Sequence, residues 1–221
     1  MKKLVKLKKE DDTLKNVDNN RMNSRVKNSH VIFVTGNFHK FNEVHSVLSS
    51  MGIGVSMLRV KGKEIQSDNI NEIAQDSAID AFNKCHVPLI VEDAGLFIDV
   101  LEGFPGPYSA YVYKTIQNRG VLKLMETIQQ NRKATFCSAL VYYSQETGLK
   151  LFEGKVEGQI TLTERVGNGN AGFGFDPIFQ PLCGEKTFAE MSIEEKNGVS
   201  HRAMAVNKFA EWYFSTFKVD K

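Results

Sequence analysis

Val31-Ile32-Phe33-Val34-Thr35-Gly36-Asn37 is the stretch that decides the fold, because a strand pattern changes to a helix pattern here. Its first five residues form a short apolar run rich in β-branched side chains, which predicts a buried strand. From Phe41 onward, apolar residues recur at helical spacing, and Gly52 is placed to end the predicted helix. A buried strand that leads directly into an amphipathic helix is typical of an α/β fold.

The next segments repeat this alternation. Residues 54–58 predict a second strand, and 70–85 predict a helix of about four turns. Residues 88–91 predict another buried strand, which ends in Glu92 and Asp93. The order strand, helix, strand, helix, strand favours a mixed α/β core.

The second half has a different pattern. We expect a helix over 121–128 and then three strands, at 135–143, 150–156 and 158–163, joined by turns at 146–148 and at Gly158. Strands joined by short turns favour antiparallel pairing. Apolar residues from Val206 to Phe217 predict a final amphipathic helix.

Composition limits the class of protein. The chain has 221 residues, of which 42 % are hydrophobic, enough for a sizeable core. Residues 1–30 hold nine basic and four acidic residues, so the remainder carries −3 of the total charge of +2. We therefore expect a basic, polar extension over 1–29 that is disordered, and one domain over 30–221.

The mildly acidic body makes a nucleic-acid-binding surface unlikely. We expect no membrane-spanning helix, because no apolar run approaches about eighteen residues. Three widely separated cysteines favour a reduced, cytoplasmic setting.

Thr35, Gly36 and Asn37 lie where the first strand meets its helix. Such a junction offers free backbone N–H groups and the positive end of the helix dipole to a phosphate, and Lys40 can reach the same anion. The alternative is an ordinary turn in which Asn37 caps the helix and Lys40 points into solvent.

Glu92 and Asp93 follow a buried strand, where α/β folds place ligands. Their hard oxygen atoms suit Mg²⁺, and a carboxylate beside the metal can activate a water molecule. Alternatively, Asp93 caps the next segment. Glu64, taken on its residue type alone, is a charged loop residue.

Phe173-Gly174-Phe175-Asp176-Pro177 places two aromatic rings beside a carboxylate. Phe173 and Phe175 could stack on a base, and Asp176 could accept a hydrogen bond from a ring N–H. The alternative is a core loop with both rings buried. The preceding 167–172 matches G-x-G-x-x-G, but no helical pattern follows it, so we expect no dinucleotide site there.

Residues 195–202, Glu-Lys-Asn-Gly-Val-Ser-His-Arg, precede the final helical pattern at 203–217. Lys196, Ser200, His201 and Arg202 offer cations and hydrogen-bond donors to an anionic ligand. A solvated charged face is the alternative.

Taken together, these motifs and the turn Phe104-Pro105-Gly106-Pro107-Tyr108 resemble the Ham1-like inosine triphosphate pyrophosphatase family from about Val31 to Phe214. The resemblance implies an elongated α/β fold with a long mixed sheet and flanking helices, whose two lobes enclose a nucleotide cleft. It also implies a homodimer. Some members carry a lysine shortly after the turn, which Ser109-Ala110-Tyr111 lacks.

The resemblance further implies Mg²⁺-dependent hydrolysis of non-standard purine nucleoside triphosphates to the monophosphate and pyrophosphate. The substrates would be inosine, deoxyinosine and xanthosine triphosphates (ITP, dITP, XTP). Two alternatives stay open: a related pyrophosphatase with another base preference, and a catalytically idle nucleotide-binding regulatory protein.

The resemblance gives each motif a role. The segment from Thr35 to Lys40 would grip the triphosphate, and the segment from Phe173 to Asp176 would form one wall of the base pocket. Asp93 would activate water, and Lys40 and Lys196 would neutralise phosphate charge. The metal would be bound by Glu64, Asp93 and Glu92. Ser200, His201 and Arg202 would line the nucleotide site from the opposite side.

Overall fold

Seven strands form one mixed sheet in the computed structural model, which describes residues 29–62, 65–167 and 172–217. The strands are β1 (His30–Val34), β2 (Gly54–Leu58), β3 (Leu89–Ile98), β4 (Pro105–Gly106), β5 (Lys133–Ser144), β6 (Gly148–Ile160) and β7 (Phe179–Pro181). Their order is β2-β1-β3-β5-β6-β7, with β4 paired to β3. Strands β2, β1 and β3 are parallel, whereas β3, β5, β6 and β7 pair antiparallel. The predicted mixed sheet with an antiparallel second half is confirmed.

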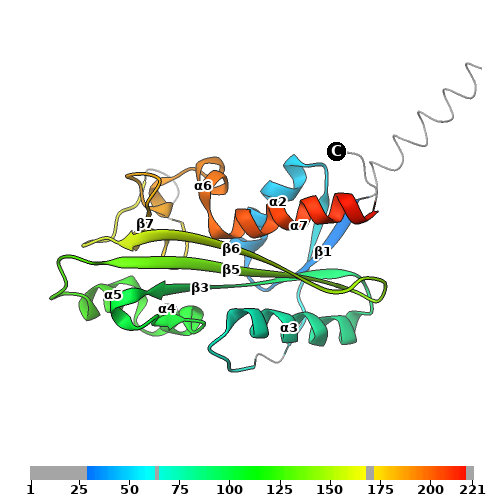
Figure 1. Ribbon diagram of the computed structural model, residues 1–221, viewed down its shortest axis with the longest axis horizontal. Helices are drawn as coiled ribbons and strands as arrows, with labels where there is room; N and C mark the ends of the chain where they lie inside the picture. The colour runs from blue at the N-terminus through cyan, green and yellow to red at the C-terminus, as the bar shows by residue number, and fades with distance from the viewer. Residues whose placement is uncertain (1–28, 63–64, 168–171, 218–221) are drawn as a thin grey trace, which may run out of the picture.

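Helices cover both faces of this sheet (Figure 1). They are α2 (Phe38–Ser50), α3 (Ile70–Cys85), α4 (Ser109–Thr115), α5 (Gln117–Leu124), α6 (Ile193–Val199) and α7 (His201–Phe217). Helices α2 and α7 pack on one face around Phe33, Leu140 and Phe209. Helix α3 packs on the opposite face around Ala78 and Val91. The helices predicted at 70–85 and at the end of the chain are therefore present.

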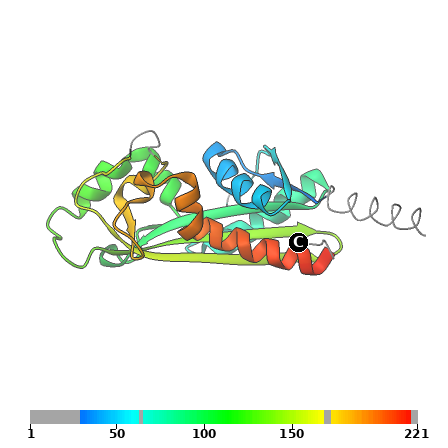
Figure 2. The same cartoon turned by 90° about the horizontal axis from the view of Figure 1, so that it is seen from above.

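A separate hydrophobic core fills the other end of the molecule. It contains Leu96, Val121, Phe136, Phe179 and Phe188, which come from β3, α5, β5, β7 and the 3₁₀ turn Phe188–Glu190. The long strands β5 and β6 run through both ends, so the molecule is elongated (Figure 2). The predicted elongated α/β fold with two lobes is confirmed, and the enclosed cleft stays a prediction.

Two predicted strand boundaries are wrong. Strand β3 continues past Asp93 to Ile98, because Glu92 and Asp93 remain in register with β5 and their backbone groups stay paired. Strand β6 does not turn at Gly158. A Cβ atom at Gly158 would lie 2.4 Å from the carbonyl oxygen of Gln180, so glycine here allows β7 to approach closely.

The helix predicted at 121–128 is shifted, since α5 begins at Gln117 and ends at Leu124. The guanidinium of Arg132 donates hydrogen bonds to the carbonyl oxygens of Met125 (3.0 Å) and Ile128 (2.5 Å). The Met125 carbonyl also accepts from the backbone N–H of Ile128 (3.0 Å), so a tight turn and the Arg132 side chain together replace a further α-helical turn.

Candidate active site

The junction between β1 and α2 presents an open backbone turn. The side chain of Asn37 caps α2, because its Oδ1 accepts hydrogen bonds from the backbone N–H groups of His39 (2.9 Å) and Lys40 (3.3 Å). Thr35 Oγ1 accepts from the N–H of Asn37 (3.1 Å). A Cβ atom at Gly36 would meet nothing within 4 Å, so there is room for a ligand against the backbone.

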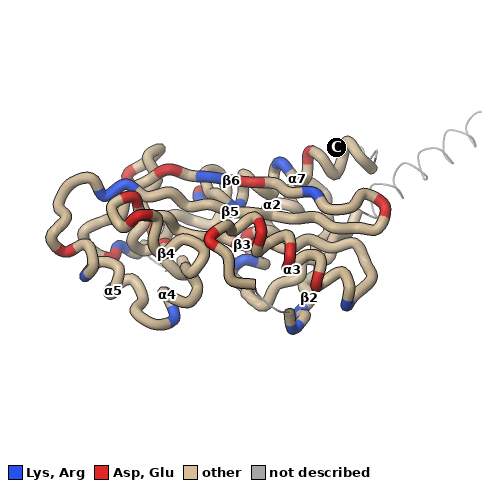
Figure 3. The backbone as a smooth tube through the Cα atoms, turned by 60° about the horizontal axis from the view of Figure 1, so that its bottom comes forward, with Lys and Arg blue, Asp and Glu red and all other residues tan. Residues whose placement is uncertain are grey.

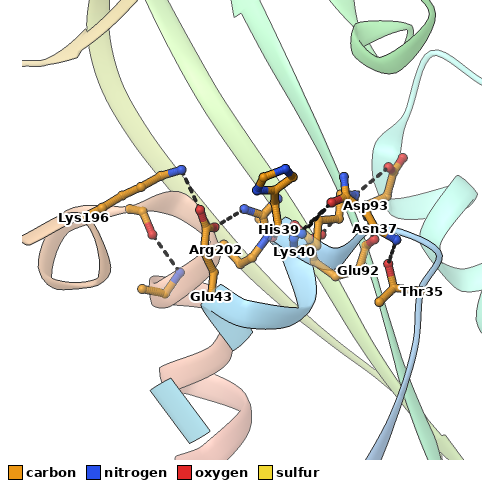
Figure 4. Close-up of polar contacts among 12 residues, drawn as sticks. Thr35, Asn37, His39, Lys40, Glu43, Glu92, Asp93, Lys196 and Arg202 are labelled. Atoms are coloured by element: carbon orange, nitrogen blue, oxygen red, sulfur yellow. Dashed lines mark hydrogen bonds and ion pairs between the residues drawn. The ribbon is translucent and has the colours of Figure 1, made fainter. Parts of the chain in front are cut away.

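Lys40 does not point into solvent. Its Nζ lies 3.1 Å from Glu92 Oε2 and 3.7 Å from Asp93 Oδ1, and it donates to the backbone carbonyl of Glu92 (3.2 Å). The Asn37 cap of the alternative reading is present, but Lys40 does not lie in solvent as that alternative expected; its contact with the carboxylates was not predicted (Figure 4). Lys40 links the turn between β1 and α2 to the middle of β3.

Glu92 is a buried carboxylate held by three partners. Its Oε1 accepts a hydrogen bond from the hydroxyl of Ser138 (2.7 Å) and lies 3.1 Å from Arg202 Nε, while Oε2 faces Lys40. Burial alone would raise the pKa of Glu92, but the charges of Arg202 and Lys40 outweigh it and hold the pKa at about 2. Glu92 is therefore ionised at neutral pH and fixes both cations.

Glu43, on α2, is a site residue that sequence reasoning missed. It is buried and forms ion pairs with Lys196 Nζ (2.6 Å) and with the Arg202 guanidinium. Burial opposes ionisation of Glu43, yet the charges of Arg202 and Lys196 lower its pKa. The available signal was a carboxylate on the apolar face of α2, beside the buried Val44 and Val47.

Lys196 has a second carboxylate partner in Asp176, whose Oδ2 lies 2.6 Å from Nζ and accepts from the N–H of Phe173 (2.9 Å). Here burial dominates, so the pKa of Asp176 is raised despite Lys196. Glu43 and Asp176 differ because Glu43 meets two cations, whereas Asp176 meets one and lies close to the negative charge of Glu43.

The ion pairs form one chain of alternating charge. It runs through Lys40, Glu92, Arg202, Glu43, Lys196 and Asp176 and joins α2 and β3 to the residues around α6 (Figure 4). Removing one partner from such a buried chain would leave an uncompensated charge and would lower the free energy of unfolding by about 3–5 kcal/mol. We call this set of six residues the charge chain.

The stretch predicted to precede the final helix is itself mostly helical. Lys196 lies in α6, and α7 begins at His201 rather than at 203. Ser200 lies between the two helices, fully buried, and its Oγ accepts from the N–H of Ala203 (3.2 Å). Ser200 is therefore a helix cap, and its predicted contact with the nucleotide stays a prediction.

His201 is buried and stacks on Phe136, with ring centroids 4.5 Å apart and planes 6° apart. Burial, helped by the charge of Arg202, lowers the pKa of His201 well below its ordinary value, so the imidazole is neutral. Within the described part of the chain, its Nδ1 is buried without a hydrogen-bond partner. A ligand that reached this nitrogen would satisfy it.

The two predicted base-stacking rings lie in different surroundings. Phe173 is partly exposed, and Lys196 Nζ and the Arg202 guanidinium carbon lie 4.9 and 5.5 Å from its ring centroid. Phe175 is buried in the core, where its ring meets the edge of Tyr113. Phe173 is thus the more accessible of the two rings, and stacking of a base on either ring stays a prediction.

The metal prediction is tested only in part. Glu64 lies outside the described residues, and among those described no three His, Cys, Asp or Glu side chains are grouped to hold a metal ion. Asp93 is the more accessible carboxylate, with 27 % of its side chain exposed, whereas Glu92 is fully buried between cations. Asp93 offers the hard oxygen atoms that Mg²⁺ prefers, and Glu92 is already neutralised.

The charges elsewhere on the molecule do not suggest a surface that binds a polyanion such as nucleic acid. Over the described residues, Figure 3 shows basic and acidic positions scattered along the chain rather than gathered on one face. No described helix has both the length and the apolar character needed to span a membrane. The fold and the charge chain instead define a mixed α/β protein in which buried cations and carboxylates lie beside a partly exposed aromatic ring.

Comparison with known proteins identifies the class more closely. Residues 31–212 match the model of the Ham1 family. A protein from Methanopyrus kandleri named dITP/XTP pyrophosphatase is 46 % identical over 183 residues, covering 83 % of this chain and 95 % of the relative. One of the same name from Thermococcus kodakarensis is 44 % identical over 186 residues, covering 84 % and 98 %.

A solved structure agrees with this match. The Ham1 protein of Coxiella burnetii superposes with a TM-score of 0.72 at 25 % identity, covering 84 % of this chain and 98 % of that one. The chain belongs to the Ham1 family. The family predicted from the motifs is thereby confirmed.

Proposed function

We propose that this protein hydrolyses non-standard purine nucleoside triphosphates, dITP, ITP and XTP, to the nucleoside monophosphate and pyrophosphate. The observation that carries the proposal is the charge chain, which ends in Lys40 beside the open turn at Gly36 and the accessible carboxylate of Asp93. Relatives that align over nearly their whole length are named dITP/XTP pyrophosphatases.

The triphosphate binds against the turn from Thr35 to Asn37, where backbone N–H groups and the start of α2 favour negative charge. Lys40 and Lys196 neutralise the phosphates. Both lysines are held in place by buried carboxylates, so little reorganisation is needed when the substrate arrives.

Asp93 accepts a proton from the attacking water molecule. The water oxygen forms a bond to the α-phosphorus, and the bond from this phosphorus to the bridging oxygen breaks, which releases pyrophosphate. Lys40 and Lys196 stabilise the charge that gathers on the leaving group. Asp93 suits the role because it is accessible at the site and lies 3.7 Å from Lys40 Nζ, the cation proposed to hold the phosphates.

Mg²⁺ is the proposed metal, with Asp93 and Glu64 as its protein ligands. When bound, the ion neutralises phosphate charge. Glu92 supports this acidic site from the interior by holding Lys40 and Arg202 rather than by ligating the metal itself.

Selectivity comes from the edge of the base. Hypoxanthine and xanthine carry a 6-oxo acceptor and an N1–H donor. Arg202 or His201 would donate a hydrogen bond to the 6-oxo group. Asp176 or a backbone carbonyl would accept one from N1–H. Adenine has a 6-amino group and no N1–H, so both contacts fail. Buried polar groups left unpaired in this way can reduce kcat/KM by 10⁴–10⁵.

The test is pyrophosphate release from a panel of nucleoside triphosphates, with and without a chelator. We expect dITP, ITP and XTP to be turned over at least about a hundredfold more efficiently than ATP, and activity to disappear with chelator. Preference for a pyrimidine triphosphate would favour a related pyrophosphatase with another base preference. Binding without release would identify a catalytically idle protein. Homodimer assembly and a cytoplasmic location stay expectations.

A further inference from the structure

His39 and Phe173 form a ring pair that the proposed mechanism does not use. The imidazole of His39 stacks on Phe173 with centroids 5.0 Å apart and planes 12° apart. His39 lies in the first turn of α2, whereas Phe173 lies between β6 and β7. The pair therefore connects the phosphate-binding turn directly to the segment expected to meet the base.

We propose that His39 is a substrate-binding residue that completes an aromatic sandwich, with the purine base inserted between its ring and Phe173. The proposal rests on the proposed function, because it concerns the base of the same nucleotide. It adds a specific residue to one side of the base site, on the helix that also binds the phosphates.

The different surroundings of the two rings support insertion. Phe173 is anchored, since its backbone N–H donates to the buried Asp176 and two cations lie over its ring. His39 is exposed at the surface of α2. For a base to enter, the exposed side chain of His39 would rotate away from the anchored ring of Phe173.

Two other aromatic rings near the site are already covered. Phe175 is buried against Tyr113, and His201 is buried on Phe136. His39, by contrast, is exposed and already lies against the ring of Phe173. Stacking on a second face also explains how the site gains affinity from any flat base, leaving the edge contacts to decide which base is accepted.

The position of His39 along α2 is consistent with this geometry. Asn37 and Lys40 flank it and belong to the phosphate side of the site, where Lys40 reaches Glu92 (Figure 4). A nucleotide bound with its phosphates at Lys40 would place its base within reach of residues that contact Phe173. The proposal therefore places the ring pair between the phosphate-binding side and the base-binding side of the nucleotide site.

The experiment compares His39→Ala, His39→Phe and the control His45→Ala. His45 is another exposed histidine on the same helix, and its ring lies beside Phe41 instead. Steady-state kinetics with dITP give KM and kcat, and inhibition by inorganic pyrophosphate serves as a base-free probe. Loss of one stacking face should raise KM by roughly 5- to 100-fold in His39→Ala and leave kcat within about twofold. His39→Phe should retain the wild-type KM, and His45→Ala should change neither constant.

Inhibition by pyrophosphate distinguishes a direct contact of His39 with the base from a purely structural role of His39 in the site. If His39 acts on the base, the inhibition constant of pyrophosphate is unchanged in His39→Ala. An equal weakening of dITP and pyrophosphate, an unchanged KM, or a lowered KM would each overturn the sandwich.

The proposed function can fail separately. If the wild-type protein releases no pyrophosphate from dITP, the function is wrong, and calorimetric binding of dITP to wild type and His39→Ala then tests the sandwich alone. A roughly 5-fold or greater loss of affinity in the variant supports it. Equal affinities, or no binding to either protein, overturn it.

Discussion

Replacement of Glu92 by glutamine tests the charge chain most quantitatively, because the variant is nearly isosteric and removes only the charge. Glu92 is fully buried, and its pKa lies at about 2 rather than at its ordinary value of 4.5. By linkage, a shift of this size corresponds to about 3 kcal/mol of folding free energy at neutral pH. For a protein of this length, we expect Glu92→Gln to lower Tm by about 6–12 °C at pH 7.

The pH dependence gives the sign of the effect. Because the pKa of Glu92 is lowered on folding, its contribution is fully present above about pH 5 and is lost as the pH falls toward 2. The folding free energies of wild type and Glu92→Gln should therefore differ at pH 7 and converge at about pH 2–3. Glutamine mimics the protonated side chain, so the difference between the two proteins isolates this group.

The assay is denaturant or thermal unfolding of both proteins across this pH range, with a chelator present so that only the protein's own charges act. Ser138→Ala is a milder companion variant, since it removes one neutral donor to Glu92 and keeps both cations. Ser138→Ala should lower the free energy of unfolding by about 1–2 kcal/mol. A Tm difference below about 2 °C for Glu92→Gln at pH 7, or a gap that persists unchanged at pH 2–3, would refute the reasoning.

Three further variants test the site. Asp93→Asn should lower turnover of dITP by roughly 10²–10⁴-fold while nucleotide binding measured by calorimetry persists; more than about a tenth of wild-type turnover would remove Asp93 as the base. Gly154→Ala should reduce both Tm and turnover, because a Cβ atom there would lie 1.9 Å from the backbone oxygen of His201 and displace the start of α7, whereas Gly184→Ala, with nothing within 4 Å, is the matched control. Arg202→Ala should lower the free energy of unfolding by about 3–5 kcal/mol. The ratio of its kcat/KM for ITP to that for ATP should fall toward one, and a preserved ratio would place Arg202 outside the base site.

Local periodicity was sufficient to predict much of the fold. The strand at 54–58 and the helix at 70–85 agree with β2 and α3 because their patterns of apolar residues are uninterrupted. Strand β3 was predicted too short, since two consecutive carboxylates resemble a strand end. Its continuation depends on Lys40 and Arg202, which neutralise Glu92 from other elements.

Long-range pairing limited what the sequence could predict about the site. Glu43 binds Lys196 and Arg202 across 153 and 159 residues, so no local pattern joins these three side chains. Motif resemblance predicted that Lys40, Asp93 and Lys196 belong to one site, but it did not predict the carboxylate that fixes the cations. Gly158 was misread for the same reason, because its close neighbour Gln180 lies on another strand.

The central claim is that water attacks the α-phosphorus of a non-standard purine nucleotide. The most direct test is turnover of an equal mixture of dITP and dATP in ¹⁸O-labelled water, with the products analysed by mass spectrometry. The account predicts one ¹⁸O atom in deoxyinosine monophosphate, unlabelled pyrophosphate, and dATP that is largely unconsumed. Label in pyrophosphate or inorganic phosphate, or consumption of both nucleotides at the same rate, would contradict it.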